Sequence, residues 1–459
     1  MRPASAPRAL PAMHRFLADP ELAAYAEIFG TTVVKAAVDA VLVPARAAAL
    51  RDVAVPPYDA LVAAVRERLA SEEAGALVAL LNATGVLLHT NLGRAPLARE
   101  ALAAIETVAS GYSNLEFDLE AGARGSRYAR VTPLLRAVTG ARDALVVNNC
   151  AAAVLLILDT FAKGREVVVS RNQLVEIGGG FRLPEVLARS GATLVEVGAT
   201  NKVYLRDFER ALSPRTALLL RSHTSNYRIE GFTADVAAPE LAALAKRAGV
   251  PSVEDLGSGA LVDLARFGLP HERTVAEAVA DGLDLVAFSG DKLLSGPQAG
   301  IVVGNPAPLA RLRANPLLRA LRVDKATLAA LDATLRLHLA PGGLAKIPLY
   351  AMLGAGVDAL RERAEALVAT LPEAVRESAR TRATEAYAGG GSSPLAALPS
   401  YGVELRDGAR NADQLAERLR RGRPRVVARI AGGAVVLDLR AIPAERDAEL
   451  GAAIASALN

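Results

Sequence analysis

A lysine surrounded by small residues is the feature of this sequence best suited to covalent chemistry. Lys292 follows a short apolar run, 285–289, that is typical of a buried strand. A lysine that forms a Schiff base must lie at a strand end, face a pocket and be partly desolvated, so that its amine can attack a carbonyl carbon. A simple ion pair with the neighbouring Asp291 would also explain a lysine at this place. Its small neighbours, which leave room for a flat ring, are Gly290, Ser295, Gly296 and Gly300.

A carboxylate and a helix start add to this lysine. Asp255 ends the apolar run 252–255 and is followed by a Gly/Ser turn. A carboxylate in this position can hold the proton on the ring nitrogen of a pyridine cofactor. The run that ends at Val147 leads straight into an Ala-rich helix start, where backbone N–H groups suit a phosphate. A helix N-cap by Asn148 or Asn149 explains the same residues without any ligand.

In this order the three elements form the pattern of fold-type-I pyridoxal-phosphate (PLP) enzymes. We predict PLP as the cofactor, with Lys292 as its Schiff-base lysine and Asp255 at its ring nitrogen. His223 and Asn226 could touch the ring oxygen of the cofactor or only order a turn, and both readings stay open. The sequence has no GxxxxGK[ST] loop, no strand-linked GxGxxG and no GxSxG elbow. The residues expected around the phosphate are Cys150, Ala151, Ala152 and Ser289.

The elements that must position these residues alternate along the chain. Short runs rich in Val, Leu and Ile alternate with helical segments, which predicts an α/β domain with a parallel sheet buried on both faces. Because the carboxyl ends of parallel strands open onto one crevice, we expect Asp255 and Lys292 to meet there. The predicted strands are 144–147, 166–170, 193–197, 217–222, 252–255, 285–289 and 300–303.

Chain length requires more than this one domain. At 459 residues the chain exceeds a single compact core. Helical periodicity predicts a helical N-terminal domain over 1–70, followed by a large PLP-binding α/β domain over 71–335. A strand–helix–strand–strand–helix pattern between 402 and 458 predicts a small α+β domain over 336–459.

Composition limits the remaining possibilities. The net charge of +4 and the pI near 9.2 permit a polyanionic partner without requiring one. The sequence has one cysteine and no apolar run of about 20 residues, which favours a cytoplasmic protein without a membrane span. The five histidines show no metal-ligand spacing, so no metal is expected. Only seven of the 53 basic residues are lysines, which leaves few candidates for a cofactor lysine.

Several stretches resemble the bacterial selenocysteine synthase family, and together they cover most of the chain. One departure is Cys150, which takes the last place of a run that is usually asparagine in that family. The stretches are 82–97 (NATGVLLHTNLGRAPL), 112–120 (YSNLEFDLE), 125–128 (GSRY), 173–179 (QLVEIGG), 223–228 (HTSNYR), 254–259 (EDLGSG), 289–294 (SGDKLL) and 296–300 (GPQAG).

The resemblance implies a reaction and its partners. It implies conversion of seryl-tRNA(Sec) to selenocysteinyl-tRNA(Sec) through an aminoacrylyl intermediate on PLP, with selenophosphate as selenium donor. Lys292 would move the proton and Asp291 would assist it. Arg94, Arg319 and Arg322 would hold the selenophosphate anion, Arg319 and Arg322 lying one helical turn apart. Alternatively, Arg319 and Arg322 form a solvent-exposed basic helix end that binds no ligand.

The resemblance also implies assembly. We expect a homo-oligomer built of dimers, with a decameric ring as one form.

The N-terminal unit, 1–51, precedes every predicted cofactor element and contains none of them. We therefore expect it to recognise the tRNA, and its candidate phosphate contacts are Arg15, Lys35, Arg46 and Arg51. A helical arm that only helps the subunits assemble would explain the same residues.

Two other functions fit parts of the sequence. A synthase-like PLP lyase or aldolase acting on a small amino acid would share the cofactor site, but would not need the N-terminal unit. A non-catalytic tRNA-binding partner would keep the fold, but would not need the pair Lys292 and Asp255.

Overall fold

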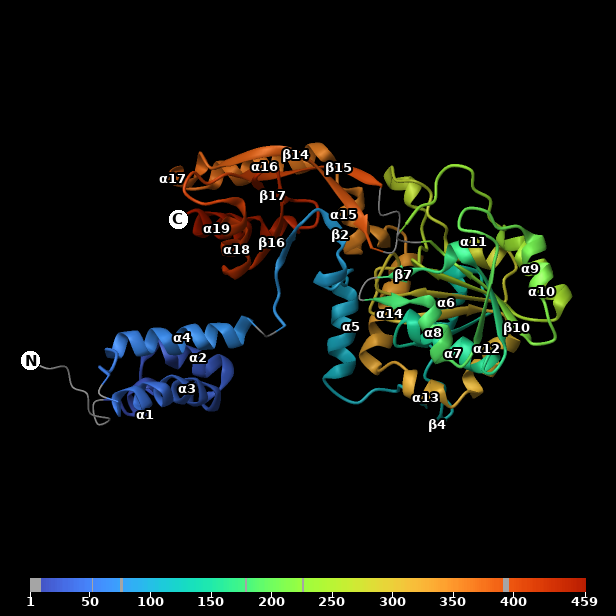
Figure 1. Cartoon of the computed structure of the whole chain (residues 1–459), viewed down its shortest axis with the longest axis horizontal. Helices are drawn as coiled ribbons and strands as arrows, with labels where there is room; N and C mark the ends of the chain where they lie inside the picture. Colours follow the sequence, from blue (N-terminus) through green and yellow to red (C-terminus); the bar gives the residue numbers. More distant parts are fainter. Residues whose placement is uncertain (1–9, 52, 75–76, 178–179, 225–226, 391–395) are drawn as a thin grey trace, which may run out of the picture. The chain divides into compact units, whose positions relative to one another are not determined.

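The computed structural model describes residues 10–51, 53–74, 77–177, 180–224, 227–390 and 396–459. The chain divides into two compact units, Met1–Ala79 and Leu80–Asn459. Figure 1 shows the first unit in blue, and the second carries all the described strands.

The first unit is a helical module. Asp19 caps its second helix by accepting from the backbone N–H groups of Glu21 and Leu22, and Pro20 occupies the first helical position. Apolar side chains at helical spacing, among them Phe16, Leu22 and Val38, form its buried core. The helical N-terminal region predicted from the sequence is therefore confirmed. Its helices are α1 (Met13–Leu17), α2 (Pro20–Phe29), α3 (Thr31–Ala49) and α4 (Tyr58–Ala74).

The second unit contains a seven-stranded sheet with the order β5-β13-β12-β11-β10-β6-β9. All seven predicted strands are present, with ends within two residues of the prediction. The expectation of a wholly parallel sheet is wrong at β13, which runs antiparallel to both neighbours. The loop from β12 to β13 is too short for the helical crossover that a parallel strand requires. The strands are β5 (Asp143–Val147), β6 (Glu166–Ser170), β9 (Thr193–Val197), β10 (Thr216–Ser222), β11 (Ser252–Gly257), β12 (Leu285–Ser289) and β13 (Gly300–Gly304).

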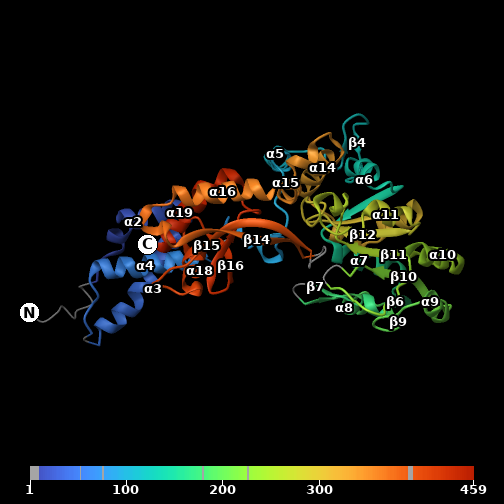
Figure 2. The ribbon, with the colours of Figure 1, turned by 90° about the horizontal axis from the view of Figure 1, so that it is seen from above.

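Helices cover both faces of this sheet, as Figures 1 and 2 show. Within β6, Val167 and Val169 join one buried cluster while Val168 joins another, so alternate side chains pack on opposite faces. This two-sided burial explains the apolar runs of the sequence. The helices around the sheet are α5 (Arg99–Ala109), α6 (Val131–Thr139), α7 (Cys150–Phe161), α8 (Leu183–Arg189), α9 (Leu205–Ala211), α10 (Ala238–Ala248), α11 (Val275–Ala280), α12 (Pro306–Ala314), α13 (Leu317–Leu321) and α14 (Lys325–Leu339). Two short hairpins, β3 (Phe117–Asp118) with β4 (Ala123–Arg124) and β7 (Glu176–Ile177) with β8 (Phe181–Arg182), complete the region.

A second sheet of six strands has the order β1-β16-β17-β15-β14-β2. The predicted strand–helix–strand–strand–helix pattern is present as β15, α18, β16, β17 and α19. The sequence did not indicate β14, nor that residues 81–88, inside the predicted range 71–335, pair with C-terminal strands. Its strands are β1 (Leu81–Ala83), β2 (Val86–Leu88), β14 (Ala379–Gly389), β15 (Ala397–Leu405), β16 (Val426–Ala431) and β17 (Ala434–Asp438). Its helices are α15 (Pro348–Gly354), α16 (Val357–Thr370), α17 (Glu373–Arg376), α18 (Ala412–Arg421) and α19 (Asp447–Leu458).

The described residues contain no helix long and apolar enough to cross a membrane. They also contain no group of three or more His, Cys, Asp and Glu side chains arranged to hold a metal ion.

Candidate active site

A cavity of about 290 Å³ lies where β11 and β12 end and α7 begins. It gathers most of the residues that the sequence singled out, although they come from segments far apart in the chain. The lining residues are Arg94, Asn149, Cys150, Ala151, Asp255, Gly257, Ser289, Asp291, Lys292 and Gln298.

Lys292 and Asp255 face a common space beside Gly257. A Cβ built on Gly257 would lie 3.8 Å from Asp255 Oδ1 and 3.8 Å from Lys292 Nζ. Gly257 has a φ of +66°, in the left-handed region that favours glycine. Lys292 is 6% exposed and Asp255 is 7% exposed. A lysine amine and an aspartate carboxyl group are thus buried around one open space, as the sequence predicts.

Close backbone contacts hold this arrangement together. A Cβ on Gly300 would lie 1.9 Å from the carbonyl oxygen of Asn149, so only glycine lets β13 approach the start of α7. A Cβ on Gly259 would lie 2.4 Å from the carbonyl oxygen of Ser289, and Gly259 has a φ of +69°. Gly300 thus brings the start of α7 against β13, and Gly259 brings the turn after β11 against the end of β12, three residues before Lys292.

The Asp255 carboxylate has a protein donor. The Cys150 thiol donates to Asp255 Oδ1 over 3.3 Å. Burial raises the pKa of Asp255 above its ordinary value, while the hydrogen bond from Cys150 and the charges of Lys292 and His223 oppose that rise. A cation placed in the cavity beside Asp255 would favour its ionised form.

The start of α7 is capped by Asn149, whose side-chain oxygen accepts from the backbone N–H of Ala152 over 2.8 Å. The N-cap interpretation is therefore correct for Asn149. Cys150 and Ala151 line the cavity, whereas Ala152 does not. The helix start faces the space beside Lys292, where partial positive charge attracts an anion.

Arg94 and Asp291 form an ion pair at the cavity wall. The Nη1 atom of Arg94 lies 2.9 Å from Asp291 Oδ2. Arg94 has a φ of +60°, a conformation that costs a non-glycine residue on the order of 1 kcal/mol and that the surrounding contacts must maintain. Residues that the sequence placed in two separate motifs are thus directly bonded.

The other two predicted anion ligands lie elsewhere in the chain. Arg319 is exposed on α13, and Arg322 lies 3.5 Å from Glu116 Oε1. The expectation that the pair shares a helical face is wrong, because α13 ends at Leu321 and Arg322 is extended. Its backbone forms a bridge with Val147 instead of continuing the helix.

His223 lies beside Asp255 through its backbone, since its N–H donates to the Asp255 carbonyl over 2.9 Å. Its Nδ1 atom is buried and has no hydrogen-bond partner among the described residues. An unpaired buried nitrogen near the cavity leaves room for a ligand contact. Asn226, the other residue proposed near the ring, lies outside the described residues.

Three lining residues were not among the predicted site residues: Asn149, Gly257 and Gln298. Gly257 and Gln298 fall within stretches 254–259 and 296–300, which carry the family resemblance, so the motifs contained the signal. Asn149 was recognised as a cap but not as part of the cavity wall.

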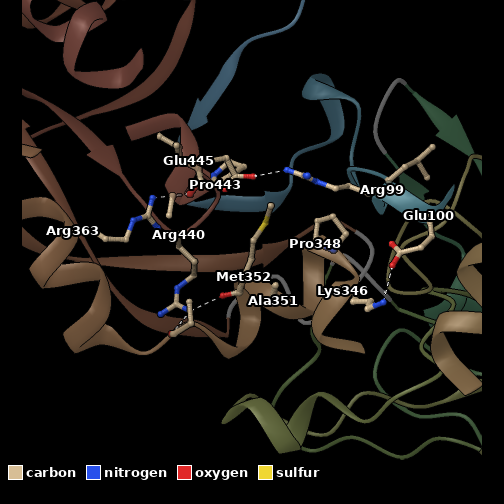
Figure 3. Close-up of a pocket in the computed structure, with 14 residues that line it drawn as sticks. Arg99, Glu100, Lys346, Pro348, Ala351, Met352, Arg363, Arg440, Pro443 and Glu445 are labelled. Carbon is tan, nitrogen blue, oxygen red and sulfur yellow. Dashed lines mark hydrogen bonds and ion pairs between the residues drawn. The ribbon is translucent and has the colours of Figure 1, made fainter. Parts of the chain in front are cut away.

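A larger cavity of about 520 Å³ lies among residues 97–100, 346–363 and 440–445. Figure 3 shows its charged side chains paired with one another or with backbone. Arg99 pairs with Glu445 and Lys346 with Glu100, while Arg440 donates to the carbonyls of residues 352 and 355. None of the predicted site residues lines it.

Known proteins resemble this chain over most of its length. Residues 80–443 match the family described as L-seryl-tRNA selenium transferase, and residues 7–46 match the selenocysteine synthase N-terminal family. The L-seryl-tRNA(Sec) selenium transferase of Solidesulfovibrio magneticus is 55% identical over 79% of this chain and 78% of its own. The enzyme of that name from Moorella thermoacetica is 50% identical over 88% of this chain and 87% of its own.

Among solved structures, a D-glucosaminate-6-phosphate ammonia-lyase matches with a TM-score of 0.60 at 18% identity. The match covers 84% of this chain and 97% of the lyase. At this identity the likeness concerns the fold alone. The predicted fold class and the predicted PLP cofactor are confirmed. The extent and identity of the sequence matches show that the chain belongs to the L-seryl-tRNA selenium transferase family.

Proposed function

We propose that this chain converts seryl-tRNA(Sec) to selenocysteinyl-tRNA(Sec), with PLP as cofactor and selenophosphate as selenium donor. The observation that carries the proposal is the burial of Lys292 and Asp255 around one open cavity in a chain of this family. The reaction replaces the seryl hydroxyl by selenium, so it needs loss of the Cα proton and departure of hydroxide as water. Both steps require a base and an acid close to one carbon atom.

The cavity fits PLP. Lys292 would hold the aldehyde carbon, Asp255 the ring nitrogen, and the N–H groups at the start of α7, with Ser289, the phosphate. The open space beside Gly257 leaves room for the ring, and the unpaired Nδ1 of His223 could hydrogen bond to the ring oxygen. When bound, PLP stabilises the negative charge that develops at the substrate Cα.

The side chains of this chain supply the rest of the chemistry. With the cofactor and substrate bound, the Lys292 amine would take the Cα proton and pass it to the seryl hydroxyl, which would leave as water. Asp291, 8% exposed and adjacent in sequence, would orient this amine or assist protonation of the hydroxyl. The surrounding burial excludes water and strengthens each of these interactions.

The direct test supplies the full-length protein, loaded with PLP, with seryl-tRNA(Sec) and selenophosphate. The amino acid released from the tRNA is then identified by mass spectrometry, and selenocysteine is expected. Lys346→Ala is a matched control, because it removes a lysine from the larger cavity. Turnover of free serine without any turnover of the charged tRNA would instead favour a lyase acting on small amino acids.

Selenophosphate would bind at an anion site that includes Arg94. Its guanidinium lines the cavity and keeps donors beyond the one bonded to Asp291. Arg319 and Arg322 do not line the same cavity, so we propose that they act from a neighbouring subunit or on the tRNA. The test removes the charge of Arg319 and measures the two half-reactions separately. Slower selenium addition with an unchanged rate of hydroxyl loss would support action on selenophosphate from a neighbouring subunit.

The N-terminal unit is proposed to recognise the tRNA. Lys35, Arg46 and Arg51 are exposed on or beside α3, and Arg15 stacks 4.1 Å from the Tyr58 ring centroid while remaining exposed. Backbone phosphates would bind such cations in a salt-dependent way. Deletion of residues 1–79 is expected to leave PLP binding intact and to weaken tRNA binding at least about tenfold. Unchanged tRNA affinity would place recognition elsewhere.

We also propose a cytoplasmic homo-oligomer built of dimers, with a decameric ring as one form. Large apolar side chains stand exposed on α5, on the segment that follows it and on the β3–β4 hairpin, which favours burial against another copy. They are Leu102, Tyr112, Phe117 and Leu119. Sedimentation of the PLP-loaded protein measures the assembly, and a monomer at micromolar concentration would contradict it.

A further inference from the structure

The cysteine at the start of α7 occupies an unusual position for a thiol. Cys150 lines the cavity and donates to Asp255 Oδ1 over 3.3 Å. It is the single cysteine of the chain. A phosphate bound at the helix start would use backbone N–H groups, so that role does not need a thiol side chain.

We propose that Cys150 is a positioning residue, whose thiol fixes the Asp255 carboxylate toward the ring nitrogen of the cofactor. This inference rests on the proposed PLP site. It gives the Cys150 side chain a different role from the phosphate contact expected from the sequence. The single S–H hydrogen bonds to one oxygen of Asp255, which leaves the other oxygen for the ring.

The electrostatics of the pair agree with this direction of donation. Burial and the neighbouring charge of Asp255 raise the pKa of the Cys150 thiol well above its ordinary value, while Lys292 and Ser289 oppose the rise. The thiol therefore stays protonated near neutral pH and remains a donor. In turn this donation lowers the pKa of Asp255 and counters the effect of its burial.

The alternative is that Cys150 only fills space at the helix start. Three substitutions separate the two roles. Cys150→Ser keeps a donor of similar size, and Cys150→Ala removes it. Asp255→Asn keeps an acceptor oxygen but removes the carboxylate charge that the thiol would direct toward the ring nitrogen. If the thiol acts through Asp255, the loss caused by Cys150→Ala must largely disappear in the Asp255→Asn background. A space-filling role would give the same loss in both backgrounds.

The first experiment measures PLP affinity of the full chain by absorbance titration. We expect Cys150→Ala to weaken PLP binding about five- to tenfold and Cys150→Ser to bind PLP within about twofold of wild type. In the Asp255→Asn background, adding Cys150→Ala should change the PLP affinity less than about twofold. Unchanged affinity in Cys150→Ala, or an equal loss in both backgrounds, overturns the proposal.

The second experiment uses the single thiol as a probe and does not depend on activity. The rate of alkylation by iodoacetamide is measured against pH in the cofactor-free full chain. Asp255→Asn removes a charge that raises the pKa of the thiol, so the alkylation curve must move to lower pH, and an unmoved curve overturns the proposal even if Cys150→Ala fails to fold. The groups facing the thiol are Asp255, Lys292 and Ser289, and only Asp255 changes.

Protection by PLP tells this inference apart from the proposed function. PLP is expected to slow alkylation of wild-type Cys150, because the thiol lines its cavity. If PLP neither binds nor protects, the proposed cofactor site fails, while the shift caused by Asp255→Asn still decides whether the thiol and the carboxylate are coupled.

Discussion

Two cavities in the larger unit, one of about 520 Å³ and one of about 290 Å³, differ in how their charges are compensated. The larger one, about 520 Å³, is lined by cations that its own acids and carbonyl oxygens already bind. The smaller one, about 290 Å³, holds a buried lysine and a buried aspartate, and the aspartate accepts a hydrogen bond from a thiol. Volume alone would select the wrong cavity. Buried ionisable side chains without a direct ion-pair partner mark the place where a ligand gains binding energy.

The largest expected effect follows from Lys292→Ala. We expect loss of all covalently held PLP and a fall in turnover of at least about 10²–10⁴-fold, because proton transfer at the substrate Cα loses its base. Borohydride reduction of the PLP-loaded wild type, followed by peptide mapping, should find the label on Lys292. A label on Lys202 or Lys325 would remove the smaller cavity from consideration as the cofactor site.

The next effect follows from Asp255→Asn, which keeps the size of the side chain and removes its charge. PLP should still bind, but turnover should fall about 10²–10³-fold, because the protonated ring nitrogen loses its partner. The absorbance spectrum and the rate of seryl-tRNA turnover measure the two quantities separately. Wild-type turnover would show that another group holds the ring nitrogen.

A smaller and more selective effect is expected for Arg94→Gln. Loss of the guanidinium should raise the KM for selenophosphate about tenfold or more and leave loss of the seryl hydroxyl nearly unchanged. Asp291→Asn serves as a comparison, since it breaks the same 2.9 Å ion pair while keeping Arg94. Equal damage to both half-reactions in Arg94→Gln would indicate a structural role for the ion pair.

Substitutions in the larger cavity should change the stability of the protein and not its turnover. Arg440 is 4% exposed and donates to several backbone carbonyls, so Arg440→Ala should lower the free energy of unfolding by about 2–4 kcal/mol. Denaturant unfolding measures this loss. Lys346→Ala, in contrast, should leave both stability and turnover nearly unchanged, because its ion pair with Glu100 is largely exposed. A strong loss of turnover in Lys346→Ala would break the distinction between the cavities.

Much of the large sheet could be predicted because its strands have a strong local signal. Runs such as Val167–Val169 are apolar at every position, which two-sided burial requires. The composition of β13 did not reveal its direction, because an antiparallel strand and a buried parallel strand have similar compositions. The signal was instead the short spacing between the runs 285–289 and 300–303, which leaves no room for a helical crossover. Likewise β1 and β2 are short, and their partners lie far along the chain: Leu81 of β1 pairs with Val426 of β16, and Val86 of β2 pairs with Tyr387 of β14.

The site divides along the same line. Local sequence determined the lysine after a strand, the aspartate before a Gly/Ser turn and the Asn149 cap, because these depend on backbone neighbours within a few positions. Only the tertiary structure decided that Cys150 bonds to Asp255, that Arg94 bonds to Asp291 and that Arg322 pairs with Glu116. These partners are separated by 105, 197 and 206 residues, respectively. Such pairs form only when packing brings distant segments together, and no periodicity of the sequence records which segments will meet.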